Sequence, residues 1–292
     1  MCGIVGLFLR DASLEHEFGA LLSTMLATMT ERGPDSAGFA VYSGAPDGGT
    51  KITVRSNEQV DFEAVARDLS ASSFVQRDTH AVLHFDTDKA GAASEAIGRN
   101  YSQVEIVSVG GRMEIYKEVG LPAEVSERFK LASMTGTHGI GHTRMATESA
   151  VTTNGAHPFT TASDQCLVHN GSLSNHHDLR RRLEKDGIRL HTENDSEAAA
   201  GYISARLRHG DTLGEALEHS LEDLDGFYTF VVGTASGFGV LRDPIACKPA
   251  VMAETDQYVA FGSEYRALVD LPGVEKGRVW EPEPATVYFW ER

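Results

Sequence analysis

The chain opens with the stretch MCGIVGLFLR, residues 1–10, on which the interpretation of the whole sequence depends. Its apolar run has no positive charge before it and ends at Arg10, so it predicts a buried strand and not a signal peptide. Removal of Met1 would leave Cys2 with a free α-amino group, whose ordinary pKa of roughly 7.7 to 8.0 suits a base for the adjacent thiol. Alone, the motif is weak, because most free cysteines are small buried apolar residues.

Two further motifs combine turn chemistry with an arginine. The stretch RGPDSAG, residues 32–38, predicts a corner between a helix and a strand, and its Arg32 could brace the strand that carries Cys2. In GHTRMAT, residues 141–147, a strand is expected to deliver Arg144 and two threonine hydroxyls, that of Thr147 among them, to one place. A planar guanidinium can bind a substrate carboxylate through two hydrogen bonds, although a surface ion pair is an equally good reading of a single arginine.

Two more motifs bring polar groups to the ends of predicted elements. In CLVHNG, residues 166–171, Asn-Gly follows an apolar strand and is typical of a hairpin turn. The Asn170 amide and the Gly171 N–H could also form an oxyanion hole, two donors aimed at developing negative charge. In TENDSE, residues 192–197, either Asp195 or Ser196 is expected to cap a helix, and Asp195 is our choice for a carboxylate that binds a substrate ammonium group.

The remaining pattern predicts a single α+β domain over residues 2–292, with antiparallel sheets covered by helices and an inserted βα lobe at about 57–130. A hairpin is expected to join the strand at 37–42 to that at 51–55, because Gly, Pro and Asp cluster between them. Helices are predicted near residues 14–29, 61–71, 90–97, 175–186, 196–208 and 213–224, and the other strands near 80–85, 104–116, 137–142, 165–169, 228–233 and 237–241.

Composition excludes several classes of function. The 292 residues include 26 Lys and Arg against 42 Asp and Glu, and the formal charge of -16 repels nucleic acid and anionic lipid surfaces. Three cysteines predict reduced thiols and a cytoplasmic protein. The sequence contains no His-Glu-x-x-His run, so no metal site is predicted. The glycines at 136, 139 and 141 lack the spacing of a dinucleotide-binding motif.

Taken together and in this order, the motifs resemble the class II glutamine amidotransferases over residues 2 to about 200. The resemblance implies the αββα four-layer sandwich of the N-terminal-nucleophile (Ntn) hydrolases. It also implies Cys2 as nucleophile, Asn170 and Gly171 as oxyanion hole, Arg144 as carboxylate clamp and Asp195 as ammonium partner. Where the family often has Trp after the clamp arginine and His-Gly after the threonine, this chain has Met145 and Glu148-Ser149, so selectivity for the amide could differ.

Residues 147–155 and 241–249 are most similar to the stand-alone amidotransferase subunit of N-methylglutamate synthase and its glutamate-synthase-like relatives. This similarity implies that ammonia or methylamine passes to a flavin-containing partner subunit, alongside a second accessory subunit. FMN and an iron-sulfur cluster would reside in the partner, and no cofactor is expected in this chain.

Two other hypotheses remain open from the sequence. The chain could be a non-catalytic structural or regulatory subunit that retains Met1, so that no free amine adjoins the thiol. It could also be an unrelated cysteine hydrolase in which His169 or His142 is the base, which would require contact between the thiol and an imidazole.

Overall fold

Strand β1 (Gly3–Leu9), which follows Cys2, is buried along its whole length. The computed structural model of the chain describes residues 2–44, 48–146 and 150–292. In it β1 lies inside a seven-stranded sheet, between β14 (Tyr258–Gly262) and β8 (His138–Arg144), and pairs antiparallel with both. Because both faces of β1 are covered, its sequence is apolar throughout and does not alternate with polar residues.

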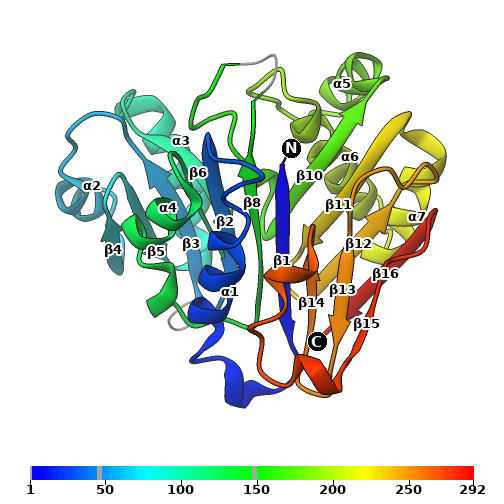
Figure 1. Cartoon of the computed structure of the whole chain (residues 1–292). Helices are drawn as coiled ribbons and strands as arrows, with labels where there is room; N and C mark the ends of the chain where they lie inside the picture. The colour runs from blue at the N-terminus through cyan, green and yellow to red at the C-terminus, as the bar shows by residue number, and fades with distance from the viewer. Residues whose placement is uncertain (1, 45–47, 147–149) are drawn as a thin grey trace.

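The described strands form three sheets (Figure 1). The seven-stranded sheet has the order β15-β13-β14-β1-β8-β2-β7 and also contains β15 (Arg278–Trp280), β13 (Val251–Glu254), β2 (Ser36–Tyr42) and β7 (Met113–Val119). The five-stranded sheet consists, in order, of β16 (Thr286–Glu291), β12 (Gly237–Arg242), β11 (Gly226–Gly233), β10 (Gln165–Leu173) and β9 (Phe159–Ala162). The four-stranded sheet consists of β4 (Ser73–Arg77), β5 (His80–Phe85), β3 (Thr50–Arg55) and β6 (Glu105–Gly110). The recorded strand pairs are antiparallel, as predicted.

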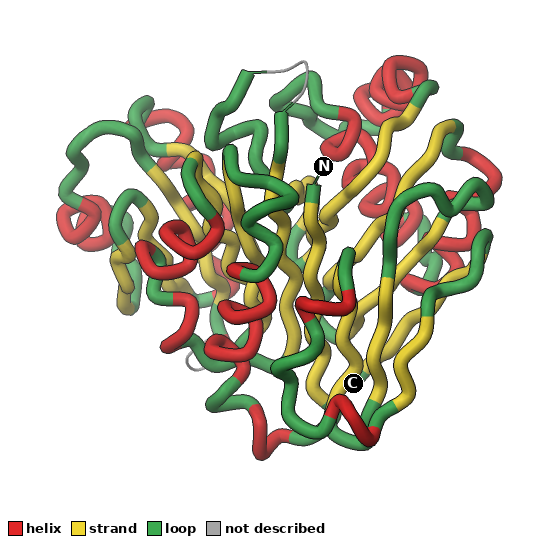
Figure 2. Tube along the Cα trace, in the orientation of Figure 1, coloured by secondary structure: helices red, strands yellow, loops and turns green. Residues whose placement is uncertain are grey.

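The two larger sheets share one hydrophobic cluster, which includes Ile4 and Phe8 from β1 together with Val168 and Val231 from the five-stranded sheet. Alternate residues of β1, such as Val5, face a second cluster that contains residues of α1 and α4. The five-stranded sheet has its own cluster with α5, α6 and α7. Figure 2 shows the strands in the interior and the helices toward the outside. These helices are α1 (Phe18–Ala27), α4 (Pro122–Arg128), α5 (His176–Lys185), α6 (Asp195–Arg208) and α7 (Leu213–Asp223).

The four-stranded sheet packs with α2 (Phe62–Asp68) and α3 (Thr87–Asn100) around a separate cluster, and lies at the left of Figure 1 beside β7. It begins at β3, before the range 57–130 in which the sequence predicts an inserted lobe. Within that range, β7 belongs to the seven-stranded sheet and α4 packs on it. Short 3-10 helices lie at Ala12–Leu14, Leu131–Ser133, Tyr265–Ala267 and Val274–Lys276.

The predicted hairpin between residues 37–42 and 51–55 is wrong. Strand β2 is flanked by β7 and β8, whereas β3 is flanked by β5 and β6 in the four-stranded sheet. Strands β2 and β3 therefore lie in different sheets, because each is paired on both sides with strands distant in sequence. In the described part of the chain, no helix combines the length and apolar character that a bilayer crossing requires.

Candidate active site

Cys2 lies at the end of the seven-stranded sheet where β1 begins and β8 ends. The register pairs Gly3 with Thr143, so the residues that follow Thr143 run past Cys2. The thiol is half-buried, and its Sγ lies 3.9 Å from the carbonyl oxygen of Met145, to which it can donate. Figure 1 marks the N-terminus at the upper end of β1. The half-buried thiol is therefore partly accessible to solvent.

Two side chains from distant parts of the chain hold the backbone of Cys2. The Nε of Arg32 donates to the Cys2 carbonyl oxygen at 3.0 Å, and the Nδ2 of Asn170 donates to the same oxygen at 3.1 Å. Arg32 comes from the segment between α1 and β2, and Asn170 from β10 in the other large sheet. The position of the cysteine is therefore fixed from both sheets at once.

Arg32 is itself held by an acidic partner. Its side chain is buried, and its Nη1 donates to Glu264 Oε1 at 2.7 Å. That hydrogen bond is the main reason why the pKa of Glu264 is lowered from its usual value. The other carboxylate oxygen of Glu264 lies 2.7 Å from Nε of Arg266. One carboxylate thus orients the guanidinium that braces Cys2.

Arg144 is the last residue of β8, one position beyond the residue that pairs with Gly3. Its guanidinium is buried, and its Nη1 donates to the carbonyl of Ala150 at 3.3 Å. Two threonine hydroxyls were expected beside Arg144, but that of Thr143 is not there. Its Oγ1 donates to the Met29 carbonyl, because neighbouring side chains of a strand point to opposite faces. The other threonine, Thr147, lies outside the described residues.

The Asn170-Gly171 pair lies inside a strand, so the hairpin-turn reading is wrong. β10 continues to Leu173, and Gly171 pairs with Tyr228 of β11. Gly171 has a φ of +154°, and a Cβ there would lie only 2.0 Å from the carbonyl oxygen of Phe227. A glycine is required here because the neighbouring strand approaches too closely for any side chain.

Asp195 begins α6 and is tied to the end of β10. Its Oδ2 accepts from the Leu173 N–H at 2.9 Å, and its Oδ1 lies 3.7 Å from His169 Nδ1. Neither Asp195 nor Ser196 caps the helix as predicted: the cap is Asn194, whose side chain accepts from Ser196 N–H at 2.9 Å. Asp195 is therefore free of the capping role, and its carboxylate lies on the side of α6 that faces β10.

Three histidines near these residues are buried, and His169 faces α6 from β10. The rings of His142 and His157 stack with centroids 3.9 Å apart, and burial lowers the pKa of His142 to about 3. The Nε2 of His142 donates to the His169 carbonyl at 3.1 Å, while His169 Nδ1 lies 2.9 Å from Ser196 Oγ. Burial also lowers the pKa of His169. The thiol bonds Met145 O and no histidine in the described chain, which argues against a thiol-imidazole pair.

The geometry thus joins Cys2, Arg32 and Asn170 by direct hydrogen bonds, and places Arg144 and Asp195 beside them through strand pairing and β10. A cavity of about 940 Å³ lies elsewhere, between β6, β9 and residues 187–192, and Cys2 does not line it. Among residues 2–44, 48–146 and 150–292, no cluster of three His, Cys, Asp or Glu could hold a metal ion.

Residues 142–270 of the chain match the family model of the glutamine amidotransferase domain. The whole chain is 60% identical to the glutamine amidotransferase-like protein GlxB of Rhizobium meliloti and covers 98% of it. It is also 32% identical to a putative glutamine amidotransferase of Methanothermobacter thermautotrophicus, over 99% of each chain. The chain belongs to the class II glutamine amidotransferases. The family expected from its motifs is thereby confirmed.

A solved structure also resembles this amidotransferase. The glutamine phosphoribosylpyrophosphate amidotransferase of B. subtilis aligns with a TM-score of 0.63 at 21% identity, over 99% of this chain and 47% of that one. At such identity the likeness concerns the fold alone, and it agrees with the predicted mixture of helices and sheets.

Several groups at the candidate site of this amidotransferase have no counterpart in the motifs. Glu264 lies 232 residues from Arg32 in sequence, and His157 stacks on His142 from the loop before β9. Asp35 belongs to the motif at residues 32–38, but its role was not predicted: its Oδ2 accepts from Ala146 N–H at 2.8 Å and joins this corner to the end of β8. Only the three-dimensional arrangement reveals these contacts, because no local spacing links the residues involved.

Proposed function

We propose that this amidotransferase hydrolyses the side-chain amide of glutamine, or a γ-glutamyl amide, through the thiolate of Cys2 once Met1 has been removed. The observation that carries this proposal is the pair of hydrogen bonds from Arg32 and Asn170 to the Cys2 carbonyl, at 3.0 and 3.1 Å. They fix the backbone of a half-buried cysteine at the start of β1. A thiol and an N-terminal amine held in this way are positioned for attack.

In the proposed reaction the α-amino group of Cys2 accepts the thiol proton, and the thiolate attacks the amide carbon. The amine then returns the proton to the leaving nitrogen, so the C–N bond breaks and ammonia or methylamine departs. Water hydrolyses the γ-glutamyl thioester, which releases glutamate and restores the thiol. The second N–H of the Asn170 amide and the Gly171 N–H would stabilise the oxyanion of each tetrahedral intermediate.

The amino-acid end of the substrate would be held by opposite charges. We assign the carboxylate to Arg144, whose buried guanidinium ends β8 one residue beyond the pairing partner of Gly3. Thr147 would add a hydroxyl to the same subsite. The ammonium group is assigned to Asp195, whose carboxylate is anchored by the Leu173 N–H at 2.9 Å next to the strand that carries Asn170.

We further propose that the two larger sheets and their helices form the αββα sandwich of the Ntn hydrolases, which the shared cluster between the sheets supports. The product amine would pass to a flavin-containing, glutamate-synthase-like subunit with a second accessory subunit, as in N-methylglutamate synthase. FMN and an iron-sulfur cluster would belong to that partner, and the complex would be cytoplasmic.

Support for a partner comes from residues 241–249, a segment that resembles this subgroup. The Asp243 carboxylate accepts from the N–H groups of Ile245 and Ala246 at 3.0 and 3.1 Å, and Ile245 is left 64% exposed. The segment thus presents an apolar side chain on a preorganised loop. Purification of the native chain tests the proposal: a co-eluting subunit with a flavin absorption spectrum supports it, and elution of the chain alone contradicts it.

The catalytic proposal is tested by Cys2→Ala. Glutaminase activity of this variant should fall to background, at least about a thousandfold, because no other group can form the thioester. Cys247→Ala is the matched control, since it removes an exposed thiol and leaves the hydrogen bonds to the Cys2 carbonyl intact, and it should leave kcat and KM unchanged. Retention of full activity by Cys2→Ala in the assembled protein would mean that the proposed mechanism is wrong.

A further inference from the structure

Residues 150–158, named here the clasp, form one wall of the Arg144 site. The Nη1 of Arg144 donates to the carbonyl of Ala150 at 3.3 Å. Gly155 lies against the same guanidinium, because a Cβ on Gly155 would be 3.0 Å from Nη1. A shift of the clasp would therefore move the guanidinium or break the hydrogen bond to Ala150.

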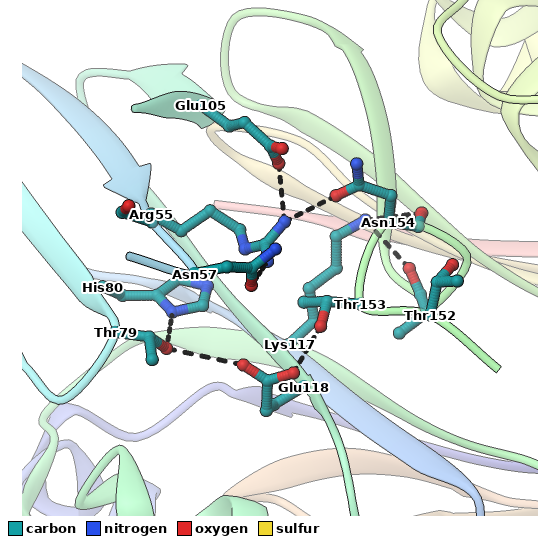
Figure 3. A network of polar contacts seen from close by, with 12 residues as sticks. Arg55, Asn57, Thr79, His80, Glu105, Lys117, Glu118, Thr152, Thr153 and Asn154 are labelled. Carbon is teal, nitrogen blue, oxygen red and sulfur yellow. Dashed lines mark hydrogen bonds and ion pairs between the residues drawn. The ribbon is translucent and has the colours of Figure 1, made fainter. Parts of the chain in front are cut away.

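Two adjacent residues of β7 hold the clasp in place (Figure 3). The Lys117 ammonium donates to the carbonyls of Asn154, Ala156 and Pro158 at 3.4, 2.9 and 3.4 Å. The Glu118 carboxylate accepts from the hydroxyl of Thr153. An ammonium has three donors, so Lys117 can hold three backbone groups of one loop together.

The four-stranded sheet supplies a third attachment (Figure 3). Arg55 of β3 is 2% exposed, and its Nη1 donates to Asn154 Oδ1 at 2.7 Å and to Glu105 Oε2 at 2.6 Å. Thr79, which precedes β5, reaches Glu118 Oε2 at 3.5 Å. The clasp is thus fixed to the seven-stranded sheet through β7 and to the four-stranded sheet through β3.

Burial of the Lys117 ammonium costs free energy. Its side chain is buried, its hydrogen bonds go to backbone carbonyls, and burial lowers its pKa to about 8. Protein cores rarely contain a cation whose hydrogen bonds go to carbonyls instead of a carboxylate, because desolvation of the charge is expensive. Lys117 also lines the cavity of about 940 Å³, and its three hydrogen bonds to one loop point to a need for a precisely positioned clasp.

We propose that Lys117, Thr153 and Asn154 are positioning residues for the carboxylate subsite: through the clasp they hold Arg144 in the orientation that binds an amino-acid substrate. This inference rests on the proposed function and names the part of the fold that sets its substrate affinity. It makes the four-stranded sheet, through Arg55, a determinant of KM. None of these residues touches the reacting atoms, so the chemical step should be insensitive to them.

Glutaminase kinetics of clasp variants test the proposal. In Thr153→Val and Asn154→Ala, one attachment is lost in each case, and KM for glutamine should rise about five- to tenfold while kcat stays within about twofold. The conservative variants Thr153→Ser and Asn154→Asp keep the hydroxyl donor and the acceptor oxygen, and should restore KM. The affinity for glutamate, measured by calorimetry, should follow the same order, because glutamate uses the same carboxylate subsite.

Lys117→Met provides the strongest variant, and Lys51→Met is its matched control. Lys51 is also buried and donates to the Ser43 carbonyl at 3.3 Å and to Glu114 at 2.7 Å, but it has no contact with the clasp. Lys117→Met should raise KM by tenfold or more, and Lys51→Met should leave it unchanged. In a Cys247→Ser background, alkylation of Cys2 by iodoacetamide, which has no carboxylate, should keep the same rate in both variants.

The inference is overturned if kcat falls while KM and glutamate affinity stay constant, or if Lys51→Met changes them as much as Lys117→Met does. If the wild-type protein showed no Cys2-dependent glutaminase activity, the proposed function would be wrong instead. Glutamate calorimetry would still decide the inference in that case, because binding does not require turnover.

Discussion

Arg32 acts on the nucleophile through the backbone and not through the thiol, since its Nε donates to the Cys2 carbonyl at 3.0 Å. Arg32→Ala removes one of the two hydrogen bonds that fix this carbonyl. We expect kcat for glutamine hydrolysis to fall about ten- to a hundredfold with little change in KM, because small displacements of a nucleophile cost this much. Steady-state kinetics, with a check of the unfolding midpoint, measure the effect.

Arg266→Ala is the control for this variant. Arg266 lies 2.7 Å from the same Glu264 but has no contact with Cys2, and it also pairs with Glu31 at 2.7 Å on the surface. Its loss should leave kcat within about twofold, because exposed ion pairs contribute little. Equal losses in the two variants would show that the charge of Glu264, and not the support of Cys2, limits activity.

At the level of single elements, β10 and β11 lie in close contact at Gly171. A Cβ there would lie 2.0 Å from the Phe227 carbonyl, a backbone atom that cannot rotate away. Gly171→Ala should therefore lower the free energy of unfolding by roughly 2 to 4 kcal/mol and weaken the oxyanion site as well. Urea unfolding followed by circular dichroism measures the loss.

Gly187→Ala separates the close contact from the backbone conformation. Gly187 also has a positive φ, +80°, but open space surrounds its Cβ position. Its substitution should cost only about 1 kcal/mol, the price of the conformation alone. If the two variants lost equal stability, the close approach of β11 would not be the reason for the glycine in β10.

Much of the element pattern could be predicted from the sequence, because it is local. The apolar run of β1, the helical spacing in α6 and the strand at 37–42 lie where their periodicity indicates. The predicted hairpin failed because turn residues do not determine which strands pair over long distances. The three-residue β15 and the four-residue β13 and β9 went unrecognised, since such short segments carry no period.

The candidate site, too, could be predicted only in part. Cys2, Arg32, Arg144, Asn170 and Asp195 could be selected because each belongs to a motif that also carries turn, strand or capping signals. The detailed geometry of these residues could not be predicted, since it depends on strand register and on the exact start of a helix. Asn194 and not Asp195 caps α6, and Gly171 lies within a strand. Glu264 and the attachments of the clasp come from segments that share no motif with these residues.

For the whole molecule, buried histidines predict a sharp dependence of stability on pH. Burial lowers the pKa of His80 to about 3, of His138 to about 4 and of His142 to about 3, all below their ordinary value of 6.5. As pH falls below about 6.5 the unfolded chain gains these protons before the folded chain does. Stability is therefore fully present above that pH and is lost as pH falls toward the folded pKa values.

Each histidine contributes a slope of up to about 1.4 kcal/mol per pH unit, so the three together can remove most of a typical stability between pH 6 and 4. Urea unfolding at pH 7, 6 and 5 should show the decline. The variant His80→Gln should reduce the slope, while substitution of the exposed His16 should leave it unchanged. A stability that stays constant from pH 7 to 5 would contradict the neutral buried state of these histidines.

The central claim is that Cys2, freed of Met1, is the nucleophile, and intact mass spectrometry of the native protein tests it most directly. The protein is weighed before and after reaction with a glutamine analogue whose side chain ends in a diazoketone, and the adduct is located by peptide mapping. We predict a chain that lacks one methionine and gains one adduct, on Cys2. A chain that retains Met1, or an adduct on another residue, would contradict the account.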